Sequence, residues 1–204
     1  KQIVKKTKYR EDGQIEKESI YEDDKLVSET KYTYNKNGQI NNIRHYKNEK
    51  LVGETEYSYF ENGQMQLENN YNKDGKKDGE GTRWNSKGQI TAIRNFKDGE
   101  EIGSITFDYY ENGQIKLKQN SKDFIQQGLA TFWYESGQMK AKIIFRDGKQ
   151  HGKTTFWYEN GKKQEESNYK DGMLDGDWKV WHEDRLGIRW KAIYKDGECI
   201  SGDC

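Results

Sequence analysis

The feature that most constrains this chain is a repeat that covers nearly all of its 204 residues. A glycine, in most cases followed by glutamine, returns at spacings of 25, 25, 25, 25, 24 and 24 residues. These glycines are Gly13, Gly38, Gly63, Gly88, Gly113, Gly137 and Gly161. Regular spacing of this length predicts a repeat architecture, in which each unit packs mainly against its neighbours.

Two columns of aromatic residues run through the repeat. The first column lies four residues before each glycine and continues into an eighth unit: Tyr9, Tyr34, Tyr59, Trp84, Tyr109, Trp133, Trp157 and Trp181. The second column has a gap at Ser121 and otherwise contains Tyr21, Tyr46, Tyr71, Phe96, Phe145, Tyr169 and Tyr194. The chain therefore has eight units.

Within a unit the hydrophobic period is two. Met139, Ala141, Ile143 and Phe145 alternate with residues that include two lysines, as expected for a half-buried strand. Asn-Gly and Asp-Gly pairs separate such segments, and these pairs favour the tight turns of β-hairpins because those turns need positive φ. Each unit is therefore predicted to be one hairpin.

The composition fits an extended sheet better than a conventional globule. Only 31% of the residues are hydrophobic and proline is absent, yet 14 Tyr, 7 Phe and 6 Trp are present. We expect an all-β fold, an elongated and twisted single antiparallel meander of about eight hairpins, with the aromatic columns forming its core on one face. Residues 1–204 are predicted to be a single repeat domain, and the atypical units 1–28 and 177–204 are candidate caps.

The charge is balanced, with 35 basic and 35 acidic side chains. A nucleic-acid-binding protein normally carries a basic face to neutralise phosphates, so we expect no nucleic-acid partner. Balanced charge also removes the repulsion that keeps copies apart. We expect a monomer with weak self-association, and membrane contact stays open.

The repeat resembles a known family. The segments GLATFWYESGQMKAKIIFRDGKQHG (residues 128–152) and GKTTFWYENGKKQEESNYKDGMLDG (residues 152–176) are similar to the variant MORN repeat of bacterial proteins, a family that includes proteins assigned as antitoxins. The resemblance implies a MORN-like solenoid that serves as a scaffold or interaction module. Eukaryotic MORN repeats also occur beside lipid-kinase domains, but this chain carries no kinase catalytic motif.

No catalytic, cofactor or metal site is predicted from the residues. His45, His151 and His182 lie in different units and lack partners at a ligand spacing. Residues 148–154 resemble a phosphate-binding loop, but three residues instead of four separate the glycines, and a strand-like segment follows where such a loop would open a helix. We therefore expect a protein that is not an enzyme and binds no cofactor.

Aromatic residues on the sheet face opposite Trp133 and Trp157 are the candidate binding residues. They are Tyr110, Phe132, Tyr134, Phe156, Tyr158 and His182. Contiguous exposed aromatics mark interaction surfaces, although sheet curvature or dimerisation could equally bury this face. The leading hypothesis is a non-enzymatic scaffold for a protein partner, antitoxin- or immunity-like or accessory to a surface protein. The alternative is a peripheral lipid- or glycan-binding module.

Cys199 and Cys204 are the two cysteines of the chain. They could close a small disulfide in an oxidising compartment, or remain free thiols. The sequence begins at Lys1 without an apolar leader, which fits an exported protein whose signal has been removed. We expect a periplasmic or cell-surface location, with a cytoplasmic one as the alternative.

Overall fold

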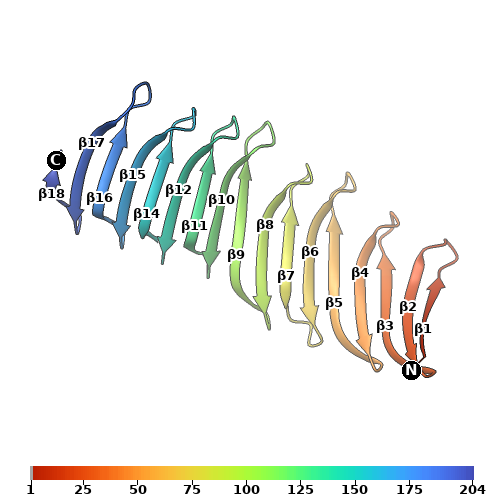
Figure 1. Ribbon diagram of the computed structural model, residues 1–204. Helices are drawn as coiled ribbons and strands as arrows, with labels where there is room; N and C mark the ends of the chain where they lie inside the picture. Colours follow the sequence, from red (N-terminus) through yellow and green to blue (C-terminus); the bar gives the residue numbers. More distant parts are fainter. Residues whose placement is uncertain (1) are drawn as a thin grey trace. The chain divides into compact units, whose positions relative to one another are not determined.

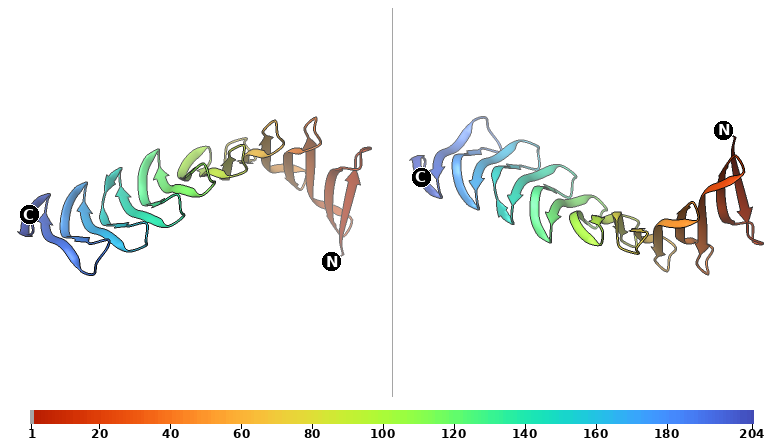
Figure 2. Two further views of the ribbon diagram at one scale, coloured as in Figure 1. Left: turned by 90° about the horizontal axis from the view of Figure 1, so that it is seen from above. Right: turned by 90° about the horizontal axis from the view of Figure 1, so that it is seen from below.

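The computed structural model describes residues 2–204 and confirms the all-β prediction (Figure 1). In this part of the chain 18 strands form an antiparallel meander, and no helix is present. Within each part of the sheet the strands lie in a single layer, and no other element covers either face (Figure 2). Lys1, the first residue of the predicted N-terminal cap, lies outside the described residues.

The chain divides into two compact units, residues 1–102 and residues 103–204, and each is described by itself. The strands of the first unit are β1 (Ile3–Tyr9), β2 (Ile15–Glu22), β3 (Lys25–Tyr34), β4 (Ile40–Lys47), β5 (Lys50–Tyr59), β6 (Met65–Asn72), β7 (Gly79–Trp84) and β8 (Ile90–Lys97). Strand β9 (Glu100–Tyr109) begins in this unit and ends in the next. The expectation of a single domain stays a prediction.

The second unit completes the repeat and adds one strand after it. Its further strands are β10 (Ile115–Lys122), β11 (Ile125–Trp133), β12 (Met139–Arg146), β13 (Lys149–Gln150), β14 (Gly152–Trp157), β15 (Lys163–Lys170), β16 (Met173–Trp181), β17 (Ile188–Lys195) and β18 (Glu198–Gly202). Strands β13 and β14 both pair with β12 and are interrupted at His151. The repeat thus contributes eight hairpins, with this one interruption, and β18 pairs with β17 as an additional edge strand.

Most hairpins end in a two-residue turn with positive φ, as the Asp-Gly pairs predict. Asp98 and Gly99 have φ values of 50° and 97° between β8 and β9. The turn between β4 and β5 adopts the same conformation without glycine, because Asn48 and Glu49 have φ values of 46° and 64°. The connection between β6 and β7 is longer, and β7 consequently pairs with β6 at only a few residues.

The glutamine that follows the repeat glycine connects neighbouring repeats. The Gln14 side-chain amide donates to the Gly38 carbonyl oxygen at 2.7 Å, and Gln39 donates to Gly63 in the same way at 2.7 Å. Each bond spans the 24 residues from one turn to the turn of the next repeat. The Gly-Gln pair therefore forms a turn and links that turn to its neighbour.

The buried core differs from the expected aromatic core. Its apolar members are mostly small, namely Ala92, Ala130, Ala141, Ile143 and Ala192. Small polar residues complete it, and Thr154 and Ser167 are only 1% and 0% exposed. A single-layer sheet offers no second layer to cover a large ring, so the aromatic rings stay partly exposed and cover the small side chains beside them.

Candidate functional site

The candidate site lies in the second unit, and strand register shows which of its side chains share a face. Phe132 on β11 pairs with Ala141 on β12, and Ala141 pairs with Phe156 on β14. Residues directly opposite each other in an antiparallel pair point to the same side of the sheet. Phe132 and Phe156 therefore flank Ala141 on one face, which we call the alanine face because it also carries Ala130.

The alanine face has a buried floor between rings. Ala141 and Ala130 are 2% and 1% exposed, and Thr154 lies beside them on β14. The second aromatic column also falls on this face, where Phe145 pairs with Gly128 across the strands. A register shift separates Phe132 from Trp133 and Phe156 from Trp157, so the strand alternation that defines the alanine face does not extend to these two tryptophans.

Tyr110, Tyr134 and Tyr158 occupy a different place, at the start of the turns that follow β9, β11 and β14. Their hydroxyl groups donate to the carbonyl oxygens of Trp133, Trp157 and Trp181 in the next repeat, at 2.7, 2.8 and 2.9 Å. Burial raises the pKa of Tyr134. The three hydroxyl groups thus connect successive repeats, and the tyrosines are half-buried.

His182 takes the equivalent position after β16, where the repeat ends. Its Nε2 atom accepts a hydrogen bond from Arg185 Nη2 at 2.9 Å. The turn that it opens holds one residue more than the others, and the His182 amide lies 3.5 Å from the Gly187 carbonyl oxygen. His182 therefore continues the tyrosine row in sequence, but among residues 2–204 its side chain bonds Arg185 of its own turn and not a following repeat.

The six predicted residues thus form two groups. Phe132 and Phe156 contribute to the alanine face, whereas the three tyrosines and His182 line the turns. Because the tyrosine hydroxyl groups are already bonded, the phenylalanine rings are the part of the set best placed to contact another molecule.

Sequence reasoning missed two tryptophans on the alanine face of this unit. Trp190 on β17 pairs with Val180 on β16 and is 41% exposed. Trp178 meets Tyr194 edge-on, with ring centroids 6.3 Å apart and an interplanar angle of 86°. Trp178 and Trp190 line a shallow hollow of about 410 Å³ together with Asp203 and Cys204. The sequence did contain a signal for Trp190. A large aromatic residue stands there at a repeat position where the equivalent strands carry Ala141 and Glu165.

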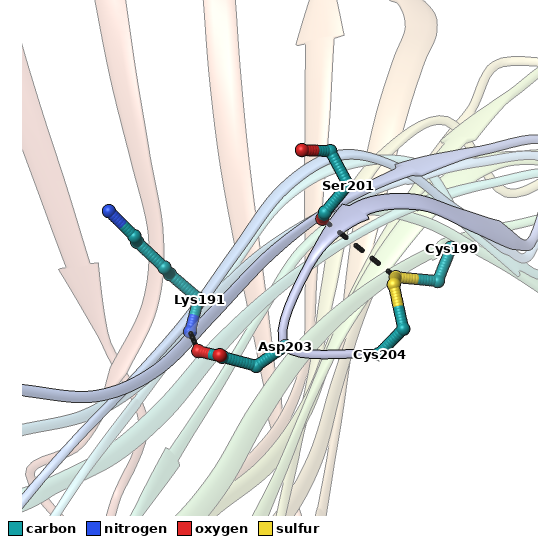
Figure 3. Close-up of a disulfide and its surroundings, with 5 residues drawn as sticks. All are labelled: Lys191, Cys199, Ser201, Asp203 and Cys204. Carbon is teal, nitrogen blue, oxygen red and sulfur yellow. Dashed lines mark hydrogen bonds between the residues drawn. A yellow bond between two sulfur atoms is a disulfide. The ribbon is translucent and has the colours of Figure 1, made fainter.

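The C-terminal residues Asp203 and Cys204, which line this hollow, fold back toward β17 (Figure 3). A disulfide joins Cys199 and Cys204, whose Cα atoms are 5.8 Å apart. Asp203 binds Lys191 on β17 twice: its amide donates to the Lys191 carbonyl oxygen at 2.8 Å, and its carboxylate accepts from the Lys191 amide at 2.9 Å. The last residues are thereby attached to the outermost hairpin.

Residues 2–204 contain neither a cluster of metal-ligating side chains nor a helix that could span a membrane. No three His, Cys, Asp or Glu side chains lie together as potential metal ligands in this part of the chain. The described residues also contain no helix long and apolar enough to cross a membrane.

The fold and the site define a β-hairpin repeat protein whose neighbouring repeats are joined by side-chain-to-backbone hydrogen bonds. Four segments match the model of the family described as MORN repeat variant, at residues 55–73, 105–123, 126–147 and 150–171. The resemblance seen in the sequence is thus confirmed, and these four segments are MORN-variant repeats. No curated protein matches the chain.

Comparison with solved structures gave only weak likenesses. A Photorhabdus luminescens Tc holotoxin pore carrying the mutation TccC3-D651A is 13% identical with a TM-score of 0.39, over 95% of this chain and 12% of the toxin chain. A TcdB2-TccC3-Cdc42 complex is 10% identical with a TM-score of 0.36, over 94% of this chain and 14% of that one. A Bacteroides fragilis protein of unknown function is 13% identical with a TM-score of 0.12, over 95% and 93% of the two chains. Similarity this weak does not bear on function.

Proposed function

We propose that this protein is a non-enzymatic repeat scaffold that binds a protein partner through the alanine face of its second unit. The observation that carries the proposal is the set of rings on that face. Phe132 and Phe156 are half-buried beside Ala141, and Trp190 is 41% exposed. Partly exposed aromatic rings fixed on a rigid sheet are typical of interface hot spots, because little side-chain entropy is lost when a partner covers them.

On the basis of the family resemblance, we also propose what kind of partner the protein binds. An antitoxin- or immunity-like role, or a role as an accessory to a surface protein, requires a stable surface and no catalysis. The disulfide between Cys199 and Cys204 supports an exported location, because such bonds persist in oxidising compartments. We propose that the protein acts there as a monomer.

Affinity capture with the whole chain tests the proposed face. The variant Phe132→Ala/Phe156→Ala removes the two rings from the alanine face. A matched control exists in the same hairpin, because Leu129 and Ile144 pair on the opposite face and are 41% and 39% exposed. We expect the wild-type chain and Leu129→Ala/Ile144→Ala to retain the same partner, and the phenylalanine variant to lose it.

The circular dichroism spectrum of each variant must match that of the wild type for the comparison to hold. Trp190→Ala, at a more exposed position, provides a second variant if the phenylalanine pair proves necessary for folding. Undiminished capture by both alanine-face variants would refute the proposed surface.

A glycan is the second candidate ligand, and the hollow beside Trp178 and Trp190 favours it. A tryptophan ring can pack against the C–H face of a sugar, and the Asp203 carboxylate at the same hollow can accept hydrogen bonds from hydroxyl groups. A glycan array probed with the wild type and with Trp190→Ala tests this role. Liposome flotation tests the related lipid hypothesis, and empty results in both assays would eliminate this alternative.

A further inference from the structure

The first unit contains a hollow of about 350 Å³ that the function proposed above does not use. It lies over β6, β7 and β8, three neighbouring strands of the sheet (Figure 1). The residues that define it are Leu67, Gly81, Arg83, Ala92, Arg94 and Phe96. All of them belong to residues 1–102, so the hollow is complete within one unit.

The hollow exists because the middle strand lacks side chains at its floor. Gly81, which lines the hollow, pairs with Arg94 on β8, and Gly79 pairs with Phe96, so β7 has no side chain opposite either of these larger residues. In the second unit the position of Gly81, three residues before the first-column tryptophan, is filled by Ala130, Thr154 and Trp178.

Gly81 is not required by the backbone conformation, since its φ lies outside the left-handed region. A Cβ atom there would lie 3.1 Å from Asn69 Oδ1 and 3.5 Å from Phe96 Cε2. The glycine therefore keeps the floor open, and a methyl group would occupy part of the space.

The rim of the hollow is cationic. Arg83 precedes Trp84 at the position held by Phe132, Phe156 and Val180 in the second unit. Arg94 occupies the position of Ile143 and Ser167, and Lys77 extends over the Phe96 ring at 4.9 Å from its centroid. This hollow thus differs from the equivalent places of the second unit at its floor and at two rim positions.

The cations are incompletely neutralised. Arg94 Nε lies 3.8 Å from the Glu101 carboxylate, which is a distant ion pair. No hydrogen bond or ion pair engages the Arg83 guanidinium within residues 2–204. Because Arg83 and Ala92 pair directly and Arg94 lies two residues further along β8, the two guanidinium groups project from diagonal neighbours on one face.

The walls below the cations are apolar, being formed by Leu67, Ala92 and the Phe96 ring. A guanidinium presents a planar fork that matches a carboxylate with two parallel hydrogen bonds. The volume is within the range of small-molecule sites. We propose that this hollow binds a small organic carboxylate, whose charged group meets Arg83 and Arg94 and whose apolar body packs against Phe96 and Leu67.

Titration of the whole chain with benzoate and with hexanoate, followed by amide chemical shifts, tests the proposal. We expect at least one probe to bind and to shift amides on β7 and β8, and benzamide, the neutral counterpart of benzoate, to bind more than tenfold more weakly. Inorganic phosphate is the third probe. Tighter binding of phosphate than of both carboxylates would show that the apolar walls contribute nothing and would overturn the proposal.

Two variants probe different parts of the hollow. Arg83→Gln removes a cation at the rim and Gly81→Ala fills the floor, and each is expected to weaken carboxylate binding about tenfold or more. Arg44→Gln is the matched control, because Arg44 is an exposed arginine of the same unit that is bonded to Glu54 away from the hollow. Failure of both carboxylates to bind, or binding unaffected by Arg83→Gln and Gly81→Ala, would refute the site. Gly81 and Arg83 are not part of the alanine face of the second unit. The result of the carboxylate titration is therefore independent of the result of affinity capture.

Discussion

At the scale of single residues, the repeat is held together by polar side chains that reach the backbone of a neighbouring unit. The hydroxyl groups of Tyr110, Tyr134 and Tyr158 and the amides of Gln14 and Gln39 all bond carbonyl oxygens in the next repeat. These bonds explain why tyrosine and glutamine recur at fixed positions in a sheet that buries few large apolar side chains.

Replacing Tyr134 with phenylalanine keeps the ring and removes only the bond to the Trp157 carbonyl oxygen. We expect the free energy of unfolding to fall by about 1 kcal/mol, the typical net contribution of one such hydrogen bond. Urea denaturation followed by circular dichroism measures the change. Tyr9→Phe is the control, because Tyr9 is 59% exposed, and it should leave the stability unchanged. Equal effects of the two substitutions would contradict a linking role for the Tyr134 hydroxyl.

Glu49 is a residue in an unfavourable conformation. Its φ of 64° lies in the left-handed region, which costs a non-glycine residue roughly 1–2 kcal/mol. Glu49→Gly should therefore stabilise the protein by about 1 kcal/mol in the same denaturation assay. Gly99→Glu makes the reverse change at the matching turn position and should destabilise by a similar amount. A loss of stability on Glu49→Gly would show that its side chain contributes more than its backbone conformation costs.

At the scale of elements, the edge strand β18 ends the second unit and depends on more than its strand pairing. It spans only Glu198–Gly202, and Ile200 is 62% exposed. The disulfide joins Cys199, inside the strand, to Cys204 just after it, and Asp203 holds the residues after the strand against β17. A short, pinned edge strand is a common way of preventing pairing with other chains.

Reduction of the Cys199–Cys204 disulfide should release this edge while the hairpins stay folded. A loop of this length contributes about 2 kcal/mol in the chain-entropy model. We expect amide hydrogen exchange in β18 to accelerate strongly and exchange in β11 and β12 to stay unchanged. Cys199→Ser/Cys204→Ser should reproduce the effect without reductant. Unchanged exchange in β18 would mean that strand pairing and Asp203 hold the edge alone.

At the scale of the whole molecule, partly buried ion pairs make the stability depend on pH. The Glu29 carboxylate accepts from Lys17 at 2.7 Å and pairs with Lys31 at 3.1 Å, and the hydrogen bond from Lys17 lowers the pKa of Glu29 from 4.5. Hydrogen bonds from Lys163 and Lys153 lower the pKa of Glu166 in the second unit. A carboxylate whose pKa is lower in the folded state stabilises the protein above its unfolded pKa.

The urea midpoint should therefore fall as the pH decreases below about 4.5, the ordinary pKa of glutamate. Glu29→Gln/Glu166→Gln should be less stable than the wild type at neutral pH and should lose less stability on acidification. Glu159→Gln is a control at an exposed turn position without a resolved ion pair. Identical acid sensitivity of the double variant and the wild type would assign the effect to other carboxylates.

The hairpin meander could be predicted from the sequence because its contacts are local. Hairpins with a period of two and tight Asp-Gly turns follow from neighbouring residues, and eight of them appear where the spacing places them. Cross-strand register could not be predicted, since bulges shift it. Asn42 pairs with Glu56, three residues before Tyr59, whereas Ala141 pairs with Phe156, one residue before Trp157.

Strand register also explains why sequence alternation did not place every residue of the candidate site. Alternation along each strand predicts the six aromatic and histidine positions, but a register shift after Phe132 and after Phe156 interrupts that alternation. Alternation cannot follow the chain into a turn, where Tyr134 points at a backbone carbonyl group. The sequence predicts an aromatic core, whereas the buried core consists of small residues. A large ring is fully buried only where a second layer covers it, and the sequence pattern does not give the number of layers.

The tyrosine bonds have a direction along the chain. In the second unit Tyr110, Tyr134 and Tyr158 reach forward to the following repeat. In the first unit Tyr34 and Tyr59, which stand one position earlier in the repeat, reach back to Ile15 and Ile40 of the preceding hairpin. Repeats from the two units are therefore not interchangeable. Duplicating residues 128–151 in place would supply each new carbonyl group with its donor. The same insertion among the first repeats would leave the new Trp133 carbonyl oxygen without a tyrosine donor, because Arg10, Asn35, Phe60 and Asn85 stand there at the position of Tyr134.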